Sequence, residues 1–188
     1  MQYLSIACRT AVALVFLLSV TGKIIGSDAF GEFTRSIDSM RILPLRYVRS
    51  TALSVVVSEG ATCVLTVAPA QALAVAGCAL AAALSVSFVM SIVQALRHGH
   101  RAPCRCFGRS TRPLGAPHIG RNLILLGISV AGLISTLGHR ASVDSQSALV
   151  AIAAGLVLGL CIAATDDLAN LLSPNQSDTS QVIRRNGG

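Results

Sequence analysis

Five long apolar stretches alternate with polar segments along the chain. They cover approximately residues 4–24, 50–67, 71–95, 121–138 and 147–165. A helix needs about 20 apolar residues to cross the hydrocarbon core of a bilayer, and each stretch is close to that length. Pro69 is the natural break between the second and third stretches, because proline cannot continue a helix. The pattern therefore predicts an all-α integral membrane bundle of about five transmembrane helices.

Composition strengthens this interpretation. Hydrophobic residues make up 53% of the chain and charged residues only 12%, about half the charged share of a typical soluble domain. A disordered chain is excluded, and an ordinary soluble domain is disfavoured. The formal net charge is +7. In an apolar chain we expect these arginines in loops that face anionic lipid headgroups, so the expected partner is the lipid bilayer and not nucleic acid.

The stretches divide the chain into three parts. Residues 1–138 contain four stretches and are predicted to form a four-helix membrane domain. Residues 139–170 add a fifth transmembrane helix, and residues 171–188 are a polar, disordered tail. No clean small-x-small cleavage site precedes Lys23, which favours an uncleaved first helix over a signal peptide.

The densest chemistry lies in the polar loop 96–120. Cys104 and Cys106 form a Cys-x-Cys pair, whose disulfide would close a small, strained and exchangeable ring. Arginines surround the pair and favour the reactive thiolate: Arg101, Arg105 and Arg109. We therefore take the two cysteines as the candidate catalytic pair.

Two other interpretations of this loop stay open. His98 and His100, with Cys104 and Cys106, supply two nitrogen and two sulfur donors, which suits a tetrahedral zinc ion. The spacing of these four residues is not that of a common zinc finger. The favoured interpretation of the two histidines is that they are solvated beside the lipid headgroups. In the third interpretation the chain is a non-catalytic membrane assembly subunit whose loop docks a partner.

Glu59 is an ionisable residue inside the second stretch. Such a residue is costly in a membrane, so we expect it to face the bundle interior with a partner. The candidate partners are Arg9, Lys23 and Ser58. Glu59 is either a proton-handling group beside a redox site or a structural, hydrogen-bonded glutamate.

The remaining polar residues of the stretches receive structural interpretations. Arg121 and Asn122 are expected to form an interfacial anchor with a capping asparagine at the start of the fourth stretch. Four cysteines are expected to be small buried hydrophobes: Cys8, Cys63, Cys78 and Cys161.

The order of these motifs resembles the MauE family, the membrane proteins of methylamine utilisation, which group with DoxX-like redox-associated membrane proteins. The resemblance covers roughly residues 4–137, so residues 1–138 are a MauE-like domain. Its most specific part is the Cys-x-Cys-Phe-Gly element before Arg-Asn. Family members usually have glycine where this chain has Arg105. The matching motifs are Gly22-Lys23, Glu59-Gly60, Arg97-His98-Gly99, Cys104-Arg105-Cys106-Phe107-Gly108 and Arg121-Asn122.

The resemblance implies an integral membrane thiol–disulfide redox protein that supports disulfide formation or maturation of a partner protein. The implied partner is a thioredoxin-like redox protein, the implied location is the bacterial cytoplasmic membrane, and a quinone is a candidate electron carrier. Phe107, Gly108 and Glu59 would support the two cysteines. Loop charge places the loop on the cytoplasmic side, whereas a role in exported disulfides places it outside. The resemblance does not identify the substrate.

Overall fold

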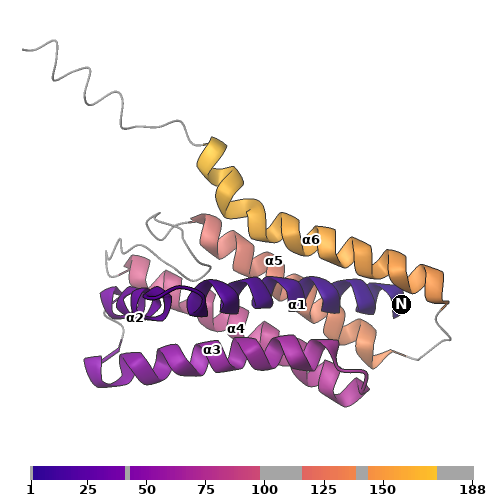
Figure 1. The fold of residues 1–188 in the computed structure, drawn as a ribbon, viewed down its shortest axis with the longest axis horizontal. Helices are drawn as coiled ribbons and strands as arrows, with labels where there is room; N and C mark the ends of the chain where they lie inside the picture. Colours follow the sequence, from indigo (N-terminus) through magenta and orange to yellow (C-terminus); the bar gives the residue numbers. More distant parts are fainter. Residues whose placement is uncertain (1, 41–42, 98–115, 139–143, 173–188) are drawn as a thin grey trace, which may run out of the picture.

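The computed structural model describes residues 2–40, 43–97, 116–138 and 144–172, with the side chains of 116–117 and 166–172 excepted. These residues form six α-helices and no strand (Figure 1). The helices, in chain order, are α1 (Gln2–Ile24), α2 (Ala29–Ser39), α3 (Leu45–Val67), α4 (Gln71–Arg97), α5 (Ala116–Leu137) and α6 (Ser145–Leu172).

Five of these helices, all except α2, are long and apolar enough to cross a membrane. The prediction of an all-α bundle of about five spans is confirmed. The helices are longer than the apolar stretches: α3 begins at Leu45, α5 at Ala116, and α6 continues to Leu172. Hydropathy marks the part of a helix that fits the hydrocarbon, whereas backbone hydrogen bonding continues into the headgroup region, where charged residues are tolerated.

Helix α2 was not predicted from the sequence. It is amphipathic, and Phe33 on its buried face packs against Ala52 and Val56 of α3. Phe30 and Ile37 flank this contact at helical spacing. At 11 residues α2 is too short to cross a membrane. Gly26 has a φ of 133°, a conformation that favours glycine, in the turn between α1 and α2.

Helix α1 is the centre of the bundle. It contacts each of the other five described helices, and α4 and α5 pack closely together beside it. Val12 and Phe16 of α1 pack with Ala81 of α4, while Val15 packs with Leu125 of α5 and Ile162 of α6. Large apolar side chains cover the outside of the bundle, which is the surface expected of a protein that contacts lipid.

Glycines let α6 lie directly on α1. A Cβ atom at Gly155 would collide with the carbonyl oxygen of Ala7, and one at Gly159 would lie 3.1 Å from the carbonyl oxygen of Ala11. The two glycines are four residues apart and so lie on one face of α6. This is the small-residue packing that membrane helices use for close approach.

Replacing Gly155 by leucine should therefore loosen the α1–α6 contact. The overlap with the Ala7 backbone cannot be relieved by moving a flexible side chain, so we expect a loss of about 1–3 kcal/mol in unfolding free energy. Thermal unfolding of the purified protein in detergent measures this loss. Gly127→Leu is the matched control, because a Cβ atom there would meet nothing within 4 Å. Equal stability of the two variants would contradict the packing argument.

Candidate functional site

A buried ion pair joins α1 to α3. The Lys23 Nζ atom lies 2.5 Å from Glu59 Oε1 and donates to the Ser19 Oγ atom at 2.8 Å. The Ser19 hydroxyl in turn donates to Glu59 Oε1 at 3.1 Å. Ser19 and Lys23 are four residues apart and share one face of α1. The side chains of Lys23 and Glu59 are only 1% and 0% exposed, so the pair is shielded from water and lipid.

Two aromatic rings enclose the ammonium group of Lys23. Its Nζ atom lies 4.8 Å from the ring centre of Phe33 on α2 and 5.6 Å from that of Phe88 on α4. Rings at these distances attract a cation through their electron-rich faces. We call Ser19, Lys23, Phe33, Glu59 and Phe88 the Lys23 cluster. Four helices meet at this cluster, which makes Lys23 a fixed point of the bundle.

Helix α5 brings further buried polar groups to the same end of the bundle. His118, Arg121 and Asn122 are 8%, 4% and 2% exposed, and the charge of Arg121 acts on Lys23. The Asn122 side-chain amide donates to the carbonyl oxygen of His118 at 2.8 Å.

The expectation of an interfacial anchor with a capping asparagine is wrong. The helix begins five residues before Arg121, with Pro117 in its first turn, so Arg121 and Asn122 lie inside the helix. Ser19 and His118 were not predicted from the sequence. Helical spacing could have found them, because Ser19 lies one turn before Lys23 and His118 one turn before Arg121 and Asn122.

Two buried oxygens near this end have no hydrogen-bond partner among the described residues: Glu59 Oε2 and Asn122 Oδ1. A buried acceptor of this kind is costly, and natural proteins keep few of them. Glu59 therefore has one oxygen committed to Lys23 and Ser19 and a second that can accept a proton or a donor group. This second oxygen is what makes the ion pair a candidate functional site and not only a structural contact.

The three candidate partners of Glu59 have different contacts in the structure. Lys23 is the ion-pair partner. Arg9 instead donates to the carbonyl oxygens of Thr66 and Ala68, at the opposite end of α3. Ser58 accepts a hydrogen bond from the Thr62 hydroxyl through its carbonyl oxygen.

The four span cysteines occupy different environments. Cys8 and Cys78 are buried, as expected for small hydrophobes. Cys63 is half-buried, and its thiol contacts the carbonyl oxygen of Ala13 at 3.6 Å. Cys161 is exposed on α6, which contradicts the expectation of a buried position.

The sequence-predicted catalytic loop lies outside the described residues. This applies to both cysteines and to every loop residue named with them, namely His98, His100, Arg101, Cys104, Arg105, Cys106, Phe107, Gly108 and Arg109. The helices that flank the segment are described: α4 ends at Arg97 and α5 begins at Ala116. Within the described ranges, no group of three or more His, Cys, Asp or Glu side chains could hold a metal ion.

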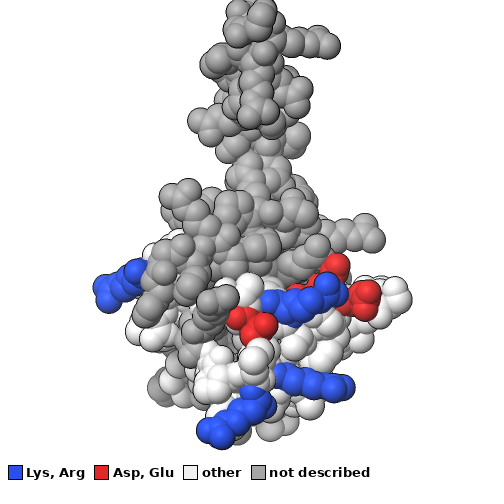
Figure 2. All heavy atoms as spheres, turned by 90° about the vertical axis from the view of Figure 1, so that its left-hand side faces the viewer, with Lys and Arg blue, Asp and Glu red and all other residues white. Residues whose placement is uncertain are grey.

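Exposed charges gather at this same end of the bundle. Basic and acidic side chains lie close to one another where α2 and the start of α3 reach the surface (Figure 2). The exposed charged residues of α2, its N-cap and the start of α3 are Asp28, Arg35, Asp38, Arg46 and Arg49. The Lys23 cluster lies inside the bundle at this end, and α2 contributes Phe33 to it.

The order of these elements along the chain agrees with a known protein family. The family model described as methylamine utilisation protein MauE matches residues 1–135. The chain belongs to the MauE family. The match contains the whole Lys23 cluster and ends within α5, so α6 lies beyond it. No curated protein and no solved structure matches the chain. Together with its five long apolar helices, family membership makes the chain a multi-pass membrane protein.

Proposed function

We propose that the chain is a membrane thiol–disulfide redox protein in which Cys104 and Cys106 exchange a disulfide with a thioredoxin-like partner. The observation that carries the proposal is the Cys104-Arg105-Cys106 sequence in the loop between α4 and α5 of a MauE-family chain. Neighbouring arginines favour the thiolate form that reacts. The family description suggests amine metabolism as the setting. We also propose a bacterial cytoplasmic membrane as the location.

Atoms and electrons balance in this exchange, because the Cys104–Cys106 disulfide is itself the oxidant of the partner. A thiolate of the reduced partner attacks one sulfur of the Cys104–Cys106 disulfide, forms a mixed disulfide and releases the other loop sulfur as a thiolate. The second partner thiolate then attacks the mixed disulfide, which closes the partner's disulfide and releases the first loop sulfur. Two electrons pass from the partner to the loop, and two protons pass from the partner's thiols to the loop's thiolates.

In this proposal Glu59, held within the Lys23 cluster, handles protons for the exchange. Support comes from the second carboxylate oxygen of Glu59, which has no hydrogen-bond partner in the described part of the chain. Support also comes from the helices that flank the loop, because α4 supplies Phe88 to the cluster and α5 supplies Arg121 beside it. Lys23 is a positioning residue that holds Glu59 in place.

Cysteine substitution tests the redox assignment. In a Cys161→Ser background, mild reduction followed by a water-soluble maleimide should label two sites, and oxidation should protect both together. Either single variant, Cys104→Ser or Cys106→Ser, should lose exchange with the partner, and one of them should accumulate a mixed disulfide on a non-reducing gel. Cys161→Ser alone is the control, because Cys161 is an exposed cysteine of α6 outside the Cys-x-Cys pair.

The alternatives predict different results. If the double variant Cys104→Ser, Cys106→Ser still supports disulfide formation in its target, the redox proposal is wrong and a docking subunit takes its place. If the purified protein instead binds zinc in a one-to-one ratio and loses it in the same double variant, the loop is a metal site.

A further inference from the structure

Two buried cysteines meet inside the bundle at a point that the proposed exchange does not use. Cys8 of α1 is 5% exposed and Cys78 of α4 is 0% exposed, and both are free thiols. A Cβ atom at Gly132 of α5 would lie 3.2 Å from Cys8 Cβ and 3.4 Å from Cys78 Sγ. The two cysteines therefore reach the same small space beside this glycine. They are also close enough to interact electrostatically.

The packing of the neighbouring turns holds Cys8 in this place. One turn before Cys8, the Ser5 hydroxyl shares a hydrogen bond of 2.7 Å with the Thr136 hydroxyl of α5. One turn after Cys8, Val12 packs against Ala81 of α4. Residues three or four apart share one face of a helix. The face of α1 that carries Cys8 is therefore held against α4 and α5 from both sides.

The surroundings of this pair restrict the oxidants that suit it. Both cysteines lie within helices that are long and apolar enough to span the membrane, and Cys8 is about 22 Å along α1 from Lys23. Charged, water-soluble oxidants are excluded from such surroundings by the cost of losing their hydration. An apolar oxidant dissolved in the bilayer fits this location. A quinone is an oxidant of this class, and it accepts two electrons and two protons.

We propose that Cys8 and Cys78 are a second redox-active pair, whose disulfide joins α1 to α4 and is formed by a membrane quinone. The Cys8 sulfur adds to the quinone ring, because Cys8 is the more exposed of the two. The Cys78 sulfur then attacks the Cys8 sulfur, so that the sulfur–sulfur bond forms as the carbon–sulfur bond breaks. The ring leaves as a quinol, which carries both electrons and the two thiol protons. The pair acts independently of Cys104 and Cys106.

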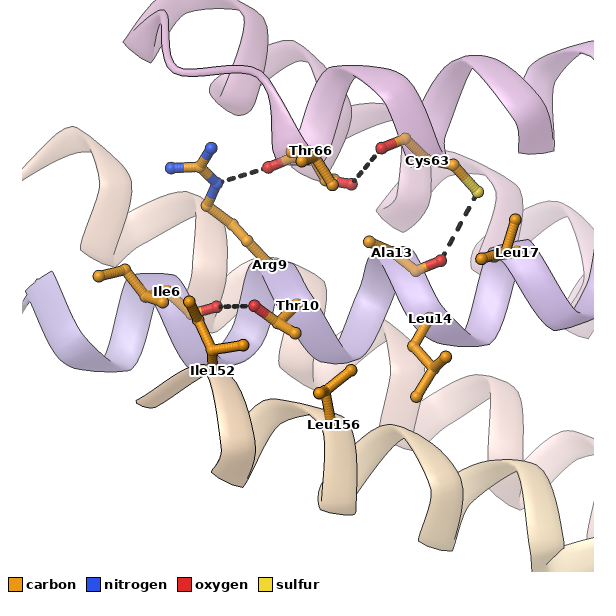
Figure 3. A pocket seen from close by; sticks show the side chains of 11 residues that line it. Ile6, Arg9, Thr10, Ala13, Leu14, Leu17, Cys63, Thr66, Ile152 and Leu156 are labelled. Atoms are coloured by element: carbon orange, nitrogen blue, oxygen red, sulfur yellow. Dashed lines mark hydrogen bonds between the residues drawn. The ribbon is translucent and has the colours of Figure 1, made fainter. Parts of the chain in front are cut away.

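Cys63 separates the effect of pairing from that of access to lipid. It lines an apolar groove of about 470 Å³ between α1, α3 and α6, with its thiol near the carbonyl oxygen of Ala13 (Figure 3). Because these helices span the membrane, the groove faces lipid chains. No second cysteine is among the described residues that line the groove. A quinone should therefore meet Cys63 more readily than the buried pair, yet leave it without a disulfide.

Oxidation of the full wild-type chain in lipid nanodiscs tests the proposal. A ubiquinone with a short alkyl tail is the oxidant. After an acid quench, free thiols are alkylated under denaturing conditions, and disulfide-linked peptides are identified by mass spectrometry. The peptides of Cys8 and Cys78 should become linked to each other, whereas Cys63 should be recovered alkylated. The same link should form in the double variant Cys104→Ser, Cys106→Ser, which separates this proposal from the redox assignment of the loop. Absence of the link in that variant would contradict the independence of the pair.

Gly132→Val tests the geometry, because it places a branched side chain against both cysteines and changes neither sulfur. We expect it to slow formation of the disulfide by about tenfold, at the low end of the cost of overpacking. Gly127→Val is the matched control, since a Cβ atom there would meet nothing within 4 Å, and it should keep the wild-type rate. Complete alkylation of Cys8 and Cys78 in the oxidised wild type would overturn the proposal. Equal rates in the two glycine variants, or a disulfide that contains Cys63 instead, would overturn it as well.

Discussion

Lys23→Met is expected to lower the free energy of unfolding by about 3–5 kcal/mol, the usual cost of removing one partner of a buried ion pair. Methionine keeps most of the volume of lysine but leaves Glu59 as an uncompensated charge with no exposure to solvent. Reversible unfolding in mixed detergent micelles measures the loss. Arg49→Met is the control, because Arg49 is exposed on the first turns of α3, and surface changes usually stay within about 0.5 kcal/mol.

Changing both partners should restore much of this loss. In the double variant Lys23→Met, Glu59→Leu no charge remains to be buried, and an apolar pair of similar volume is often as stable as the ion pair it replaces. Among single changes at Glu59, glutamine should cost less than leucine, because its amide oxygen can still accept from Lys23 and Ser19. A double variant as unstable as the sum of the two single variants would contradict the coupling of these side chains.

The number of spans could be predicted because a bilayer sets a minimum length for each apolar helix. Helix α2 does not meet this length criterion, because it has only 11 residues and buries a single face against α3. Its amphipathic pattern, with Phe30, Phe33 and Ile37 at helical spacing, was present in the sequence, but a search for apolar stretches of spanning length does not detect it. The start of α5 was missed for a related reason, because Arg121 appeared to close an apolar stretch that in fact continues as helix to Ala116.

The sequence limited the candidate partners of Glu59 but did not identify which of them forms the ion pair. Three residues had suitable chemistry, and the choice depends on the register between α1 and α3. The antiparallel contact sets Arg9 against Thr66 and Ala13 against Cys63, and this register brings Ser19 and Lys23 to Glu59. The convergence of Phe33 and Phe88 on Lys23 depends on four helices at once. Such a contact is determined by how the helices pack. The order of polar positions along the sequence gives no information on that packing.

Glu59→Gln should slow disulfide exchange by about a hundredfold, at the low end of what a positioned acid–base group contributes. The glutamine oxygen can keep the hydrogen bonds to Lys23 and Ser19, but its amide nitrogen replaces the Oε2 atom that has no partner in the described residues. The variant can therefore hold the helices together without taking up a proton. The measurement is the rate of partner oxidation over a range of pH, and the part of the pH dependence due to Glu59 should vanish.

Ser19→Ala is the control for this experiment, because it removes a hydrogen bond to the same carboxylate and leaves the proton-accepting oxygen in place. We expect it to lower stability with little effect on the exchange rate. If Glu59→Gln exchanges at the wild-type rate while the cysteine variants do not, the thiol pair carries the reaction and the Lys23 cluster is structural. If both cysteine variants also keep full activity, the redox assignment itself is wrong. Because a carboxylate and an amide are nearly equal in size, a rate loss confined to Glu59→Gln can be assigned to the proton and not to packing.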